Sequence, residues 1–377
     1  MIPYLRFYRK STYPKVLAFL LCLIASLSIT MLYSAGHSFS PWALKQLARF
    51  VVSFLAFSVI SYLDLRLWLL YASFIFLASL GLLVGVELLG FIGMGAKRWI
   101  DLYIFQLQPS EIMKFSLILL IAAHFHFLGL RHHKLRSIVL PVVAIFISAL
   151  LVLRQPDLGT TIILCAVGFS MLFAAGVPWY FFISLGTVCL LTLPIIWSFL
   201  KVYQKKRILT FLNPGADPLG AGYHTLQSKI AIGSGGLWGK GLGHGSQGQL
   251  DFLPEKQTDF IFTMLCEEWG FFGALFLLGI YLFILVKSYL LALRCPVIFT
   301  KLLVVGVIST LFFHVFVNIG MVIGILPIVG VPLPLMSYGG TSLLAFMVGF
   351  GWLAAADSQQ QARLPLSGVN SAEAPVL

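Results

Sequence analysis

The chain has 377 residues, of which 59% are hydrophobic and only 10% are charged, and its formal net charge is +12. An ordinary soluble protein carries about a quarter charged residues, so this composition excludes that class. Apolar runs of about 18 or more residues recur along the sequence, each long enough to cross roughly 30 Å of hydrocarbon. Backbone groups in lipid need partners within their own segment, which favours helices. A β-barrel would show apolar and polar residues alternating with a period of two, and the sequence shows no such alternation. The sequence therefore predicts an all-α polytopic membrane protein.

Ten apolar segments are candidate membrane-spanning helices. They lie at about residues 15–35, 45–63, 67–90, 109–128, 136–153, 159–175, 178–199, 260–286, 299–325 and 340–356. The first lacks the short core and small-residue end of a cleaved signal, so we expect it to be retained. We expect one transmembrane domain (1–356) with a large extracytoplasmic loop at about 200–258, followed by a disordered tail (357–377). The five cysteines show no metal or disulfide spacing and are predicted to be small buried hydrophobic residues.

Basic residues indicate the topology. An even number of spans places both termini on one side, and loops rich in Lys and Arg are usually cytoplasmic. Arg66, the cluster at 131–136 and the basic residues from Lys287 to Lys301 then share one side with the N-terminus. We therefore predict that both termini are cytoplasmic.

Other cations fall on the opposite, outer side. Lys97, Arg98 and Arg154 lie there in short loops, where the positive-inside rule disfavours them. The long loop carries further cations but escapes the rule, so only part of the outer charge is unusual. An outer face that keeps its cations in short loops predicts an anionic ligand, of which phosphate is the simplest.

The first outer loop of interest is 95–102, in which Trp99 follows a basic pair. A Trp at the end of a span is either an interfacial anchor or a binding group. Pro109 and Glu111 are typical of the first turn of a helix. Glu111 and Lys114 are three residues apart and share a helix face. They are predicted to form a half-buried salt bridge or to line a polar cavity.

Two later segments carry further candidates. In 154–161, Pro and Gly predict a tight turn and Asp157 a helix cap, whereas Arg154 has no evident structural role. The glycine-rich segment 233–243 includes Lys240 but is not a nucleotide-binding loop, because Gly241 replaces the Ser or Thr that should follow the lysine. It is either a flexible turn or a loop whose N–H groups approach a phosphate.

The segment 253–262 ends the longest polar stretch and enters an apolar run. Asp259 lies at this junction, where a carboxylate is partly desolvated yet still meets a substrate from the water side. Its alternative role is a helix N-cap. Glu267 and Glu268 follow on the same predicted helix, about 12 Å deeper. Glu267 is the candidate for a polar interior, and hydrogen bonding between helices is the alternative.

The last polar features belong to the final two spans. His314 and Asn318 are four residues apart and share a helix face. Segment 330–342 breaks the helix and restarts it, and its prolines and glycines predict free N–H groups at the new helix start. Such an end attracts an anion, although a plain turn explains the sequence equally well.

Together these stretches resemble the SEDS family of cell-wall glycosyltransferases, which includes RodA, FtsW and SpoVE. The resemblance covers essentially the whole chain and rests on the segments 95–102, 108–111, 154–161, 213–224, 227–236, 253–262 and 332–342. The amino-acid sequence at 217–224 and 249–255 is more similar to the RodA (elongation) branch than to the division branch. One departure is Gln257, where the family usually has His; we interpret it as a hydrogen-bonding position.

The resemblance implies the polymerisation of lipid II at the outer face of the bacterial inner membrane, without a nucleotide or nucleic acid. It also implies a class B penicillin-binding protein as partner, which performs transpeptidation. An acceptor sugar hydroxyl would attack the anomeric carbon of the donor, and undecaprenyl pyrophosphate would leave with inversion. Such a site needs a general base, for which we predict Asp259, and cations for the leaving group. The predicted substrate-binding residues are Lys97, Arg98, Trp99, Glu111, Lys114, Arg154, Lys240, Glu255 and Ser337.

The chemistry is compatible with a divalent cation, Mg or Mn, held by Asp259 and phosphate, but no ligand cluster in the sequence demands one. A competing interpretation is a flippase for lipid-linked precursors or an ion-coupled carrier. A carrier predicts repeated halves and polar residues through the mid-plane, and the sequence shows no clear inverted repeat. A non-catalytic scaffold would leave Asp259 unexplained.

Overall fold

The computed structural model describes residues 12–36, 42–93, 96–101, 106–129, 135–199, 202–213, 221–250, 252–253 and 255–359. Ten apolar helices occupy the ten predicted spans: α1 (Tyr13–Gly36), α2 (Trp42–Tyr62), α3 (Leu65–Leu89), α4 (Pro109–Leu128), α5 (Leu135–Arg154), α6 (Leu158–Ala174), α7 (Trp179–Phe199), α11 (Ile261–Arg294), α12 (Ile298–Val322) and α13 (Gly340–Ser358). Eight of them are long and apolar enough to cross a membrane, and α6 and α7 contribute shorter apolar stretches. The predicted all-α polytopic membrane fold is confirmed.

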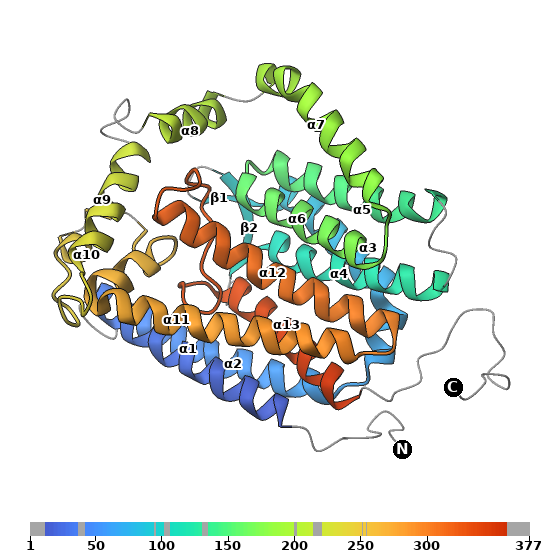
Figure 1. The fold of residues 1–377 in the computed structure, drawn as a ribbon, viewed down its shortest axis with the longest axis horizontal. Helices are drawn as coiled ribbons and strands as arrows, with labels where there is room; N and C mark the ends of the chain where they lie inside the picture. The colour runs from blue at the N-terminus through green and yellow to red at the C-terminus, as the bar shows by residue number, and fades with distance from the viewer. Residues whose placement is uncertain are drawn as a thin grey trace.

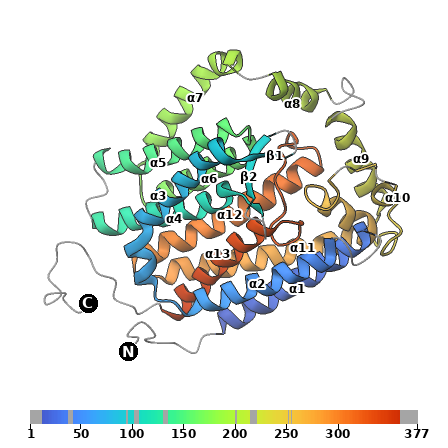
Figure 2. The ribbon, with the colours of Figure 1, turned by 180° about the vertical axis from the view of Figure 1, so that it is seen from behind.

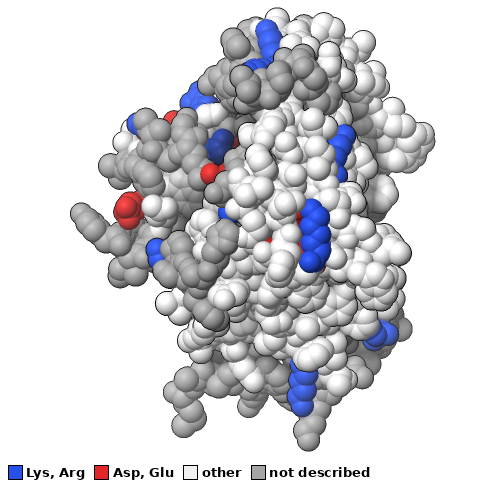
Figure 3. Space-filling view, turned by 90° about the vertical axis from the view of Figure 1, so that its left-hand side faces the viewer, with Lys and Arg blue, Asp and Glu red and all other residues white. Residues whose placement is uncertain are grey.

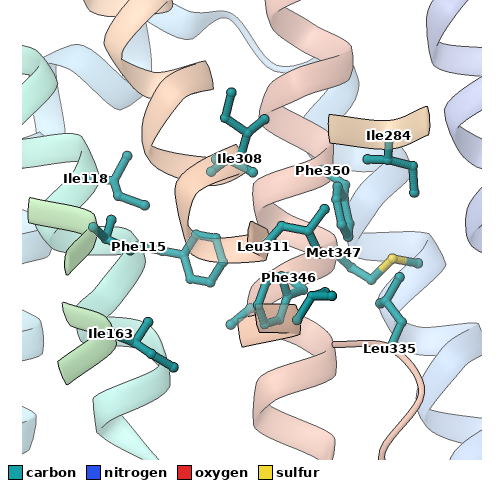
Figure 4. Packing of buried hydrophobic residues seen from close by; sticks show 14 of the residues in the cluster. Phe115, Ile118, Ile163, Ile284, Ile308, Leu311, Leu335, Phe346, Met347 and Phe350 are labelled. Carbon is teal, nitrogen blue, oxygen red and sulfur yellow. The ribbon is translucent and has the colours of Figure 1, made fainter. Parts of the chain in front are cut away.

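The bundle is built around α4, α12 and α13 (Figure 1). A cluster of apolar side chains, among them Phe115, Leu311 and Phe346, packs between these helices (Figure 4). Phe115 of α4 meets Phe346 of α13 edge to face, with ring centroids 5.6 Å apart. Gly349 and Gly306 allow these helices to approach, because a Cβ at either position would lie within 2.5 Å of a neighbouring side chain. In contrast, α7 leans away from the bundle in both views, and many of its large apolar side chains are exposed (Figures 1 and 2).

One end of the bundle gathers the start of α1 and the end of α13. The Gln359 amide donates to Leu63 O and accepts from Leu65 N, while Tyr13 hydrogen-bonds Ser288 near the end of α11. The first and last helices therefore begin and end together, as an even number of spans requires. That this end is cytoplasmic stays a prediction. The basic cluster at 131–134 and the tail from 360 lie outside the described residues, and α13 extends two residues into the predicted tail.

The opposite end carries structure that the sequence only partly predicted. A small antiparallel sheet of β1 (Phe91–Gly93), β2 (Ala96–Asp101) and β3 (Gln106–Leu107) forms where we expected a loop. Its strands are too short to show a period. The large loop contains α8 (Val202–Leu212), α9 (Ala221–Ser234) and α10 (Ser246–Gln249). All three lie within the range 200–258 that we expected to be one large loop.

The cysteines are all free, but the prediction that they are buried holds only in part. Cys266 and Cys295 are buried, whereas Cys22 and Cys189 are exposed on α1 and α7. Composition cannot separate these cases, because the lipid-facing surface of a span is as apolar as its packed face.

Helix α11 is broken at Gly270, which has φ 67° and ψ −162°. The glycine-rich segment fills the break. Lys240 N and Gly241 N donate to the carbonyls of Glu267 and Glu268, and the N–H groups of Phe271 and Phe272 donate to the carbonyls of Gly236 and Leu237. Non-helical backbone near membrane depth is tolerated only when its polar groups find partners in this way.

We predict that Gly270→Ala lowers the thermal unfolding midpoint of the purified protein, with a loss of about 1–3 kcal/mol. A Cβ at Gly270 would lie 2.3 Å from Gly239 N, and its positive φ disfavours any other residue. Gly279→Ala is the matched control on the same helix, because nothing lies within 4 Å of its Cβ position. Alanine there should be neutral or stabilising by up to about 1 kcal/mol. Equal midpoints for the two variants would contradict the account of the break.

Candidate active site

Asp259 lies in a turn at 255–260 that leads into α11, at the end of the bundle opposite the start of α1 and the end of α13. Glu255 starts this turn with φ 51°, and its carbonyl accepts from Thr258 N at 3.0 Å and from Asp259 N at 3.1 Å. The N-cap position of α11 belongs to Phe260, so the alternative role of Asp259 as N-cap is wrong. Asp259 is partly exposed, as expected for a carboxylate at the junction of a polar and an apolar segment.

The loop that joins α12 to α13 packs directly on this turn. Ser337 Oγ donates to Thr258 O at 2.6 Å, and Tyr338 N donates to Gln257 O at 2.8 Å. Gly330 has φ 73°, and a Cβ there would lie 3.4 Å from Asp259 Oδ2. The backbone at Gly330 therefore forms one wall beside the carboxylate. Ser337, a predicted substrate-binding residue, is buried and joins the two loops.

Two side chains of α12 hold the same loop from below. Asn318 Nδ2 donates to Asp259 O at 3.0 Å and to Val331 O at 2.7 Å. One turn earlier, His314 Nδ1 lies 3.4 Å from Pro332 O. Both side chains are buried, and the predicted shared face of His314 and Asn318 is confirmed. Their four-residue spacing in an apolar span was the signal, although we did not expect Asn318 to contact Asp259 or His314 to contact the loop beside it.

A buried ion pair continues this polar chain into the bundle. Lys114 Nζ lies 2.8 Å from Glu111 Oε1 and 2.7 Å from His314 Nε2. Lys114 is fully buried and Glu111 is 2% exposed. The predicted salt bridge between Glu111 and Lys114 is confirmed, but it is fully buried and not half-buried as expected. The chain of contacts runs from Glu111 to Lys114, His314 and the loop beside Asp259.

The outer basic residues approach this loop from the other side. Arg98 Nε donates to Gln155 O at 3.0 Å, and its Nη2 donates to Pro156 O. Gly159, at the start of α6, packs so closely on the loop that a Cβ would lie 2.7 Å from Val331 Cγ2. Asp157 accepts from Thr160 N at 3.2 Å and caps α6, as predicted. The structure therefore brings the β-sheet loop, the α5–α6 turn and the loop beside Asp259 together.

The side chains in these loops differ in exposure. Lys97 and Arg154 are exposed, whereas Arg98 and Trp99 are partly buried in β2. The sequence did not single out Arg49 of α2, whose guanidinium carbon lies 4.2 Å above the Tyr338 ring, beside the start of α13. An arginine within a predicted apolar span was the available signal.

Gln257 and Glu255 form a small polar cluster within the turn. Gln257 Nε2 donates to Glu255 Oε2 at 3.2 Å, and Thr258 Oγ1 lies 3.3 Å from the same oxygen. Gln257 thus acts as a hydrogen-bond donor at the position where the resembling family usually has His.

Lys240 occupies a different group. Its Nζ lies 2.7 Å from Glu267 Oε1, which also accepts from Ser246 Oγ and Gln247 N. The N–H groups of Gly239, Lys240 and Gly241 donate to backbone carbonyls, so these three are not available to a phosphate. That other N–H groups of the segment approach one stays a prediction. Glu268 accepts from Ser34 Oγ of α1 at 2.5 Å, which is the predicted bonding between helices.

No cluster of three or more His, Cys, Asp or Glu side chains that could hold a metal occurs in the part of the chain that the structure describes. A divalent cation between Asp259 and a phosphate therefore stays a prediction. On the side where α9 and α10 lie, Lys and Arg stand out against a mostly uncharged surface with few acidic residues (Figure 3).

Comparison with known proteins places this geometry in context. The chain matches the family model described as "Cell cycle protein" (FtsW, RodA and SpoVE) over residues 11–362. It is 41% identical over 339 residues to the peptidoglycan glycosyltransferase MrdB of Escherichia coli, covering 90% of this chain and 91% of that protein. It is 34% identical over 360 residues to the stage V sporulation protein E of Bacillus subtilis, covering 91% and 97% of the two chains.

Two solved structures are also similar. One comes from a study of the structural coordination of polymerization and crosslinking by a peptidoglycan synthase complex; it has a TM-score of 0.81 at 30% identity and covers 94% of this chain and 99% of its own. The other is the rod shape determining protein RodA of Thermus thermophilus, with a TM-score of 0.70 at 28% identity, covering 92% and 97%.

The buried pair makes a prediction about stability. Lys114→Met or Glu111→Leu alone should cost about 3–5 kcal/mol, because each leaves an unpaired buried charge, and the double variant should cost less than the sum. Reversible unfolding in mixed micelles measures both. Arg66→Gln removes an exposed partner of Asp64 and is the control, with a cost below about 1 kcal/mol. Additive costs in the double variant would show that the two charges do not act as a pair.

Proposed function

This chain belongs to the cell cycle protein family of FtsW, RodA and SpoVE, and from that membership we infer that it is a peptidoglycan glycosyltransferase. The activity and the role in cell shape are those for which its relatives are named. Coverage of about nine-tenths of both chains supports this, because the whole transmembrane fold is shared. The contact of Asp259 with the loop at 330–332 is the observation on which our proposal for the mechanism rests.

We propose that Asp259 is the general base. Its carboxylate is partly exposed, so a water-side hydroxyl can reach it, while Gly330 and the α12–α13 loop shield one side. A base placed within hydrogen-bond distance of the acceptor hydroxyl removes its proton as the oxygen attacks the anomeric carbon of the donor. A positioned base contributes about 10²–10⁴-fold to the rate. Inverting hydrolysis uses a second carboxyl group to protonate the leaving sugar oxygen. A pyrophosphate leaves as a stable anion, so one carboxylate base is sufficient for this direct displacement with inversion.

The leaving group is a lipid pyrophosphate, whose developing negative charge needs preorganised cations. Lys97, Arg98 and Arg154 are the proposed donors, because the β-sheet loop and the α5–α6 turn meet beside the loop that flanks Asp259. Two N–H groups of Arg98 already donate to the carbonyls of residues 155 and 156. The exposed side chains of Lys97 and Arg154 are therefore more available to the pyrophosphate. We propose that Lys240 acts indirectly. It pairs with Glu267, about two helical turns along α11 from Asp259, and so holds the first half of that helix.

We propose that Trp99 and Glu255 also contact the substrate at the outer surface. Glu111, Lys114 and Ser337 lie beneath that surface and support the loops that bind the substrate. We further propose lipid II as donor and acceptor, at the outer face of the bacterial inner membrane, with both termini cytoplasmic. The partner is a class B penicillin-binding protein that crosslinks the glycan product. A structural match that covers 94% of this chain supports the proposed partner. The matching structure comes from a study of a peptidoglycan synthase complex in which polymerization and crosslinking are coordinated.

Asp259→Asn tests the base. The amide keeps the shape of the side chain but cannot accept the proton, so polymer formation from labelled lipid II should fall by about 10²–10⁴-fold. The product is measured as glycan chains on a gel, and lipid II binding should persist. Asp64→Asn, at the opposite end of the bundle, is the control and should retain full activity. Near-normal turnover by Asp259→Asn would remove Asp259 from the mechanism, and translocation without polymer by the wild type would favour the flippase.

Arg154→Glu tests the leaving-group site. Charge reversal on this exposed residue should lower kcat/KM for lipid II about tenfold, equivalent to about 1.4 kcal/mol of transition-state stabilisation. The effect should shrink as ionic strength rises, because exposed charges are screened. Arg294→Glu reverses an equally exposed arginine at the end of α11 and should change neither constant. An unchanged KM and kcat in Arg154→Glu would exclude Arg154 from donor binding.

A further inference from the structure

His314 has no part in the mechanism described so far, yet it lies between the buried ion pair and the loop beside Asp259. It is 1% exposed, and both of its ring nitrogens face polar atoms. Its ring also meets Phe346 edge to face, with centroids 5.0 Å apart. A histidine in this position is held on three sides by α4, α13 and the α12–α13 loop.

The neighbours of His314 determine where its proton lies. Lys114 Nζ is 2.7 Å from Nε2, and an ammonium group only donates, so Nε2 must be the acceptor. The ring is then neutral and carries its proton on Nδ1, which faces Pro332 O at 3.4 Å. Each nitrogen therefore has one defined role: Nε2 accepts from Lys114, and Nδ1 donates to the loop.

The loop that receives this bond is the one that flanks Asp259. Asn318, one turn after His314, binds the adjacent carbonyl of Val331 and also Asp259 O. Gly330 lies next in the chain and forms the wall beside Asp259 Oδ2. Because three consecutive loop residues are involved, a shift of Pro332 would move the carboxylate's neighbour and its backbone anchor together.

We propose that His314 is a positioning residue for the transfer reaction: as a neutral imidazole it transmits the fixed position of the Glu111–Lys114 pair to the loop at 330–332 and so sets the geometry of Asp259. This rests on the proposed role of Asp259 as general base. His314 touches no reacting atom, keeps its Nδ1 proton and transfers no proton during turnover.

The test compares two replacements in the full-length protein with labelled lipid II. His314→Gln keeps an acceptor for Lys114 and a donor for Pro332 O, and it should retain kcat within about threefold of wild type. His314→Leu keeps the volume but removes both bonds, and kcat should fall at least about tenfold while KM changes less than about twofold. A loss in kcat alone is expected for a displaced base, because groups that act only in the transition state affect kcat and not substrate binding.

Two outcomes would overturn the proposal. Wild-type kcat in His314→Leu would show that the loop needs no support from His314. Equal inactivity of the Gln and Leu variants would show that the imidazole itself is required, as in a proton relay. Asp259→Asn is assayed in parallel: if it is active, the proposed base is wrong whatever His314 does, whereas an inactive Asp259→Asn with an active His314→Leu sinks only the positioning role.

A spectroscopic measurement covers the case in which His314→Leu does not fold. In the wild-type protein labelled with ¹⁵N-histidine, the resonance that disappears in His314→Gln belongs to His314. At neutral pH it should show an unprotonated Nε2 and a protonated Nδ1. A doubly protonated ring, or the opposite tautomer, would contradict the proposal.

Discussion

The structure depends on a pair of opposite charges buried between apolar helices. An isolated charge in such surroundings costs several kcal/mol, so Glu111 and Lys114 are tolerable only while they remain together and hydrogen-bonded. The pair is 2.8 Å apart and shares its ammonium with His314. This requirement fixes α4 against α12 at the level of the outer loops, which places the α12–α13 loop and, with it, the wall beside Asp259.

The broken helix α11 follows a similar physical rule on the other side of Asp259. The break at Gly270 exposes backbone groups that lipid cannot satisfy, and the glycine-rich segment supplies their partners. Lys240 and Glu267 tie that segment to the first half of α11. Asp259 therefore lies just before the first half of α11, whose far end is held by the glycine-rich segment. Its own turn is held by the α12–α13 loop and by Asn318. A base and its cations can keep a defined geometry at the membrane surface under these constraints.

The sequence predicted the features that depend on local chemistry. Ten apolar runs became ten helices, the three-residue spacing of Glu111 and Lys114 became an ion pair, and Asp157 became a cap. It could not predict features that depend on which loops meet. Glu267, which pairs with Lys240, lies 27 residues away in the chain, and Asp259, whose carbonyl accepts from Asn318, lies 59 residues away. No local pattern in the sequence reveals these two contacts. The contacts of the glycine-rich segment could not be predicted for the same reason, since the carbonyls that accept from Lys240 N and Gly241 N belong to α11.

The most direct measurement of the central claim is a structure of the protein with lipid-linked disaccharides in both the donor and acceptor positions. The account predicts that a carboxylate oxygen of Asp259 lies about 2.6–3.2 Å from the attacking hydroxyl, as a general base requires, with the pyrophosphate against the basic loops. An acceptor hydroxyl that instead meets another base, with Asp259 out of hydrogen-bond reach and no cation near the pyrophosphate, would contradict it.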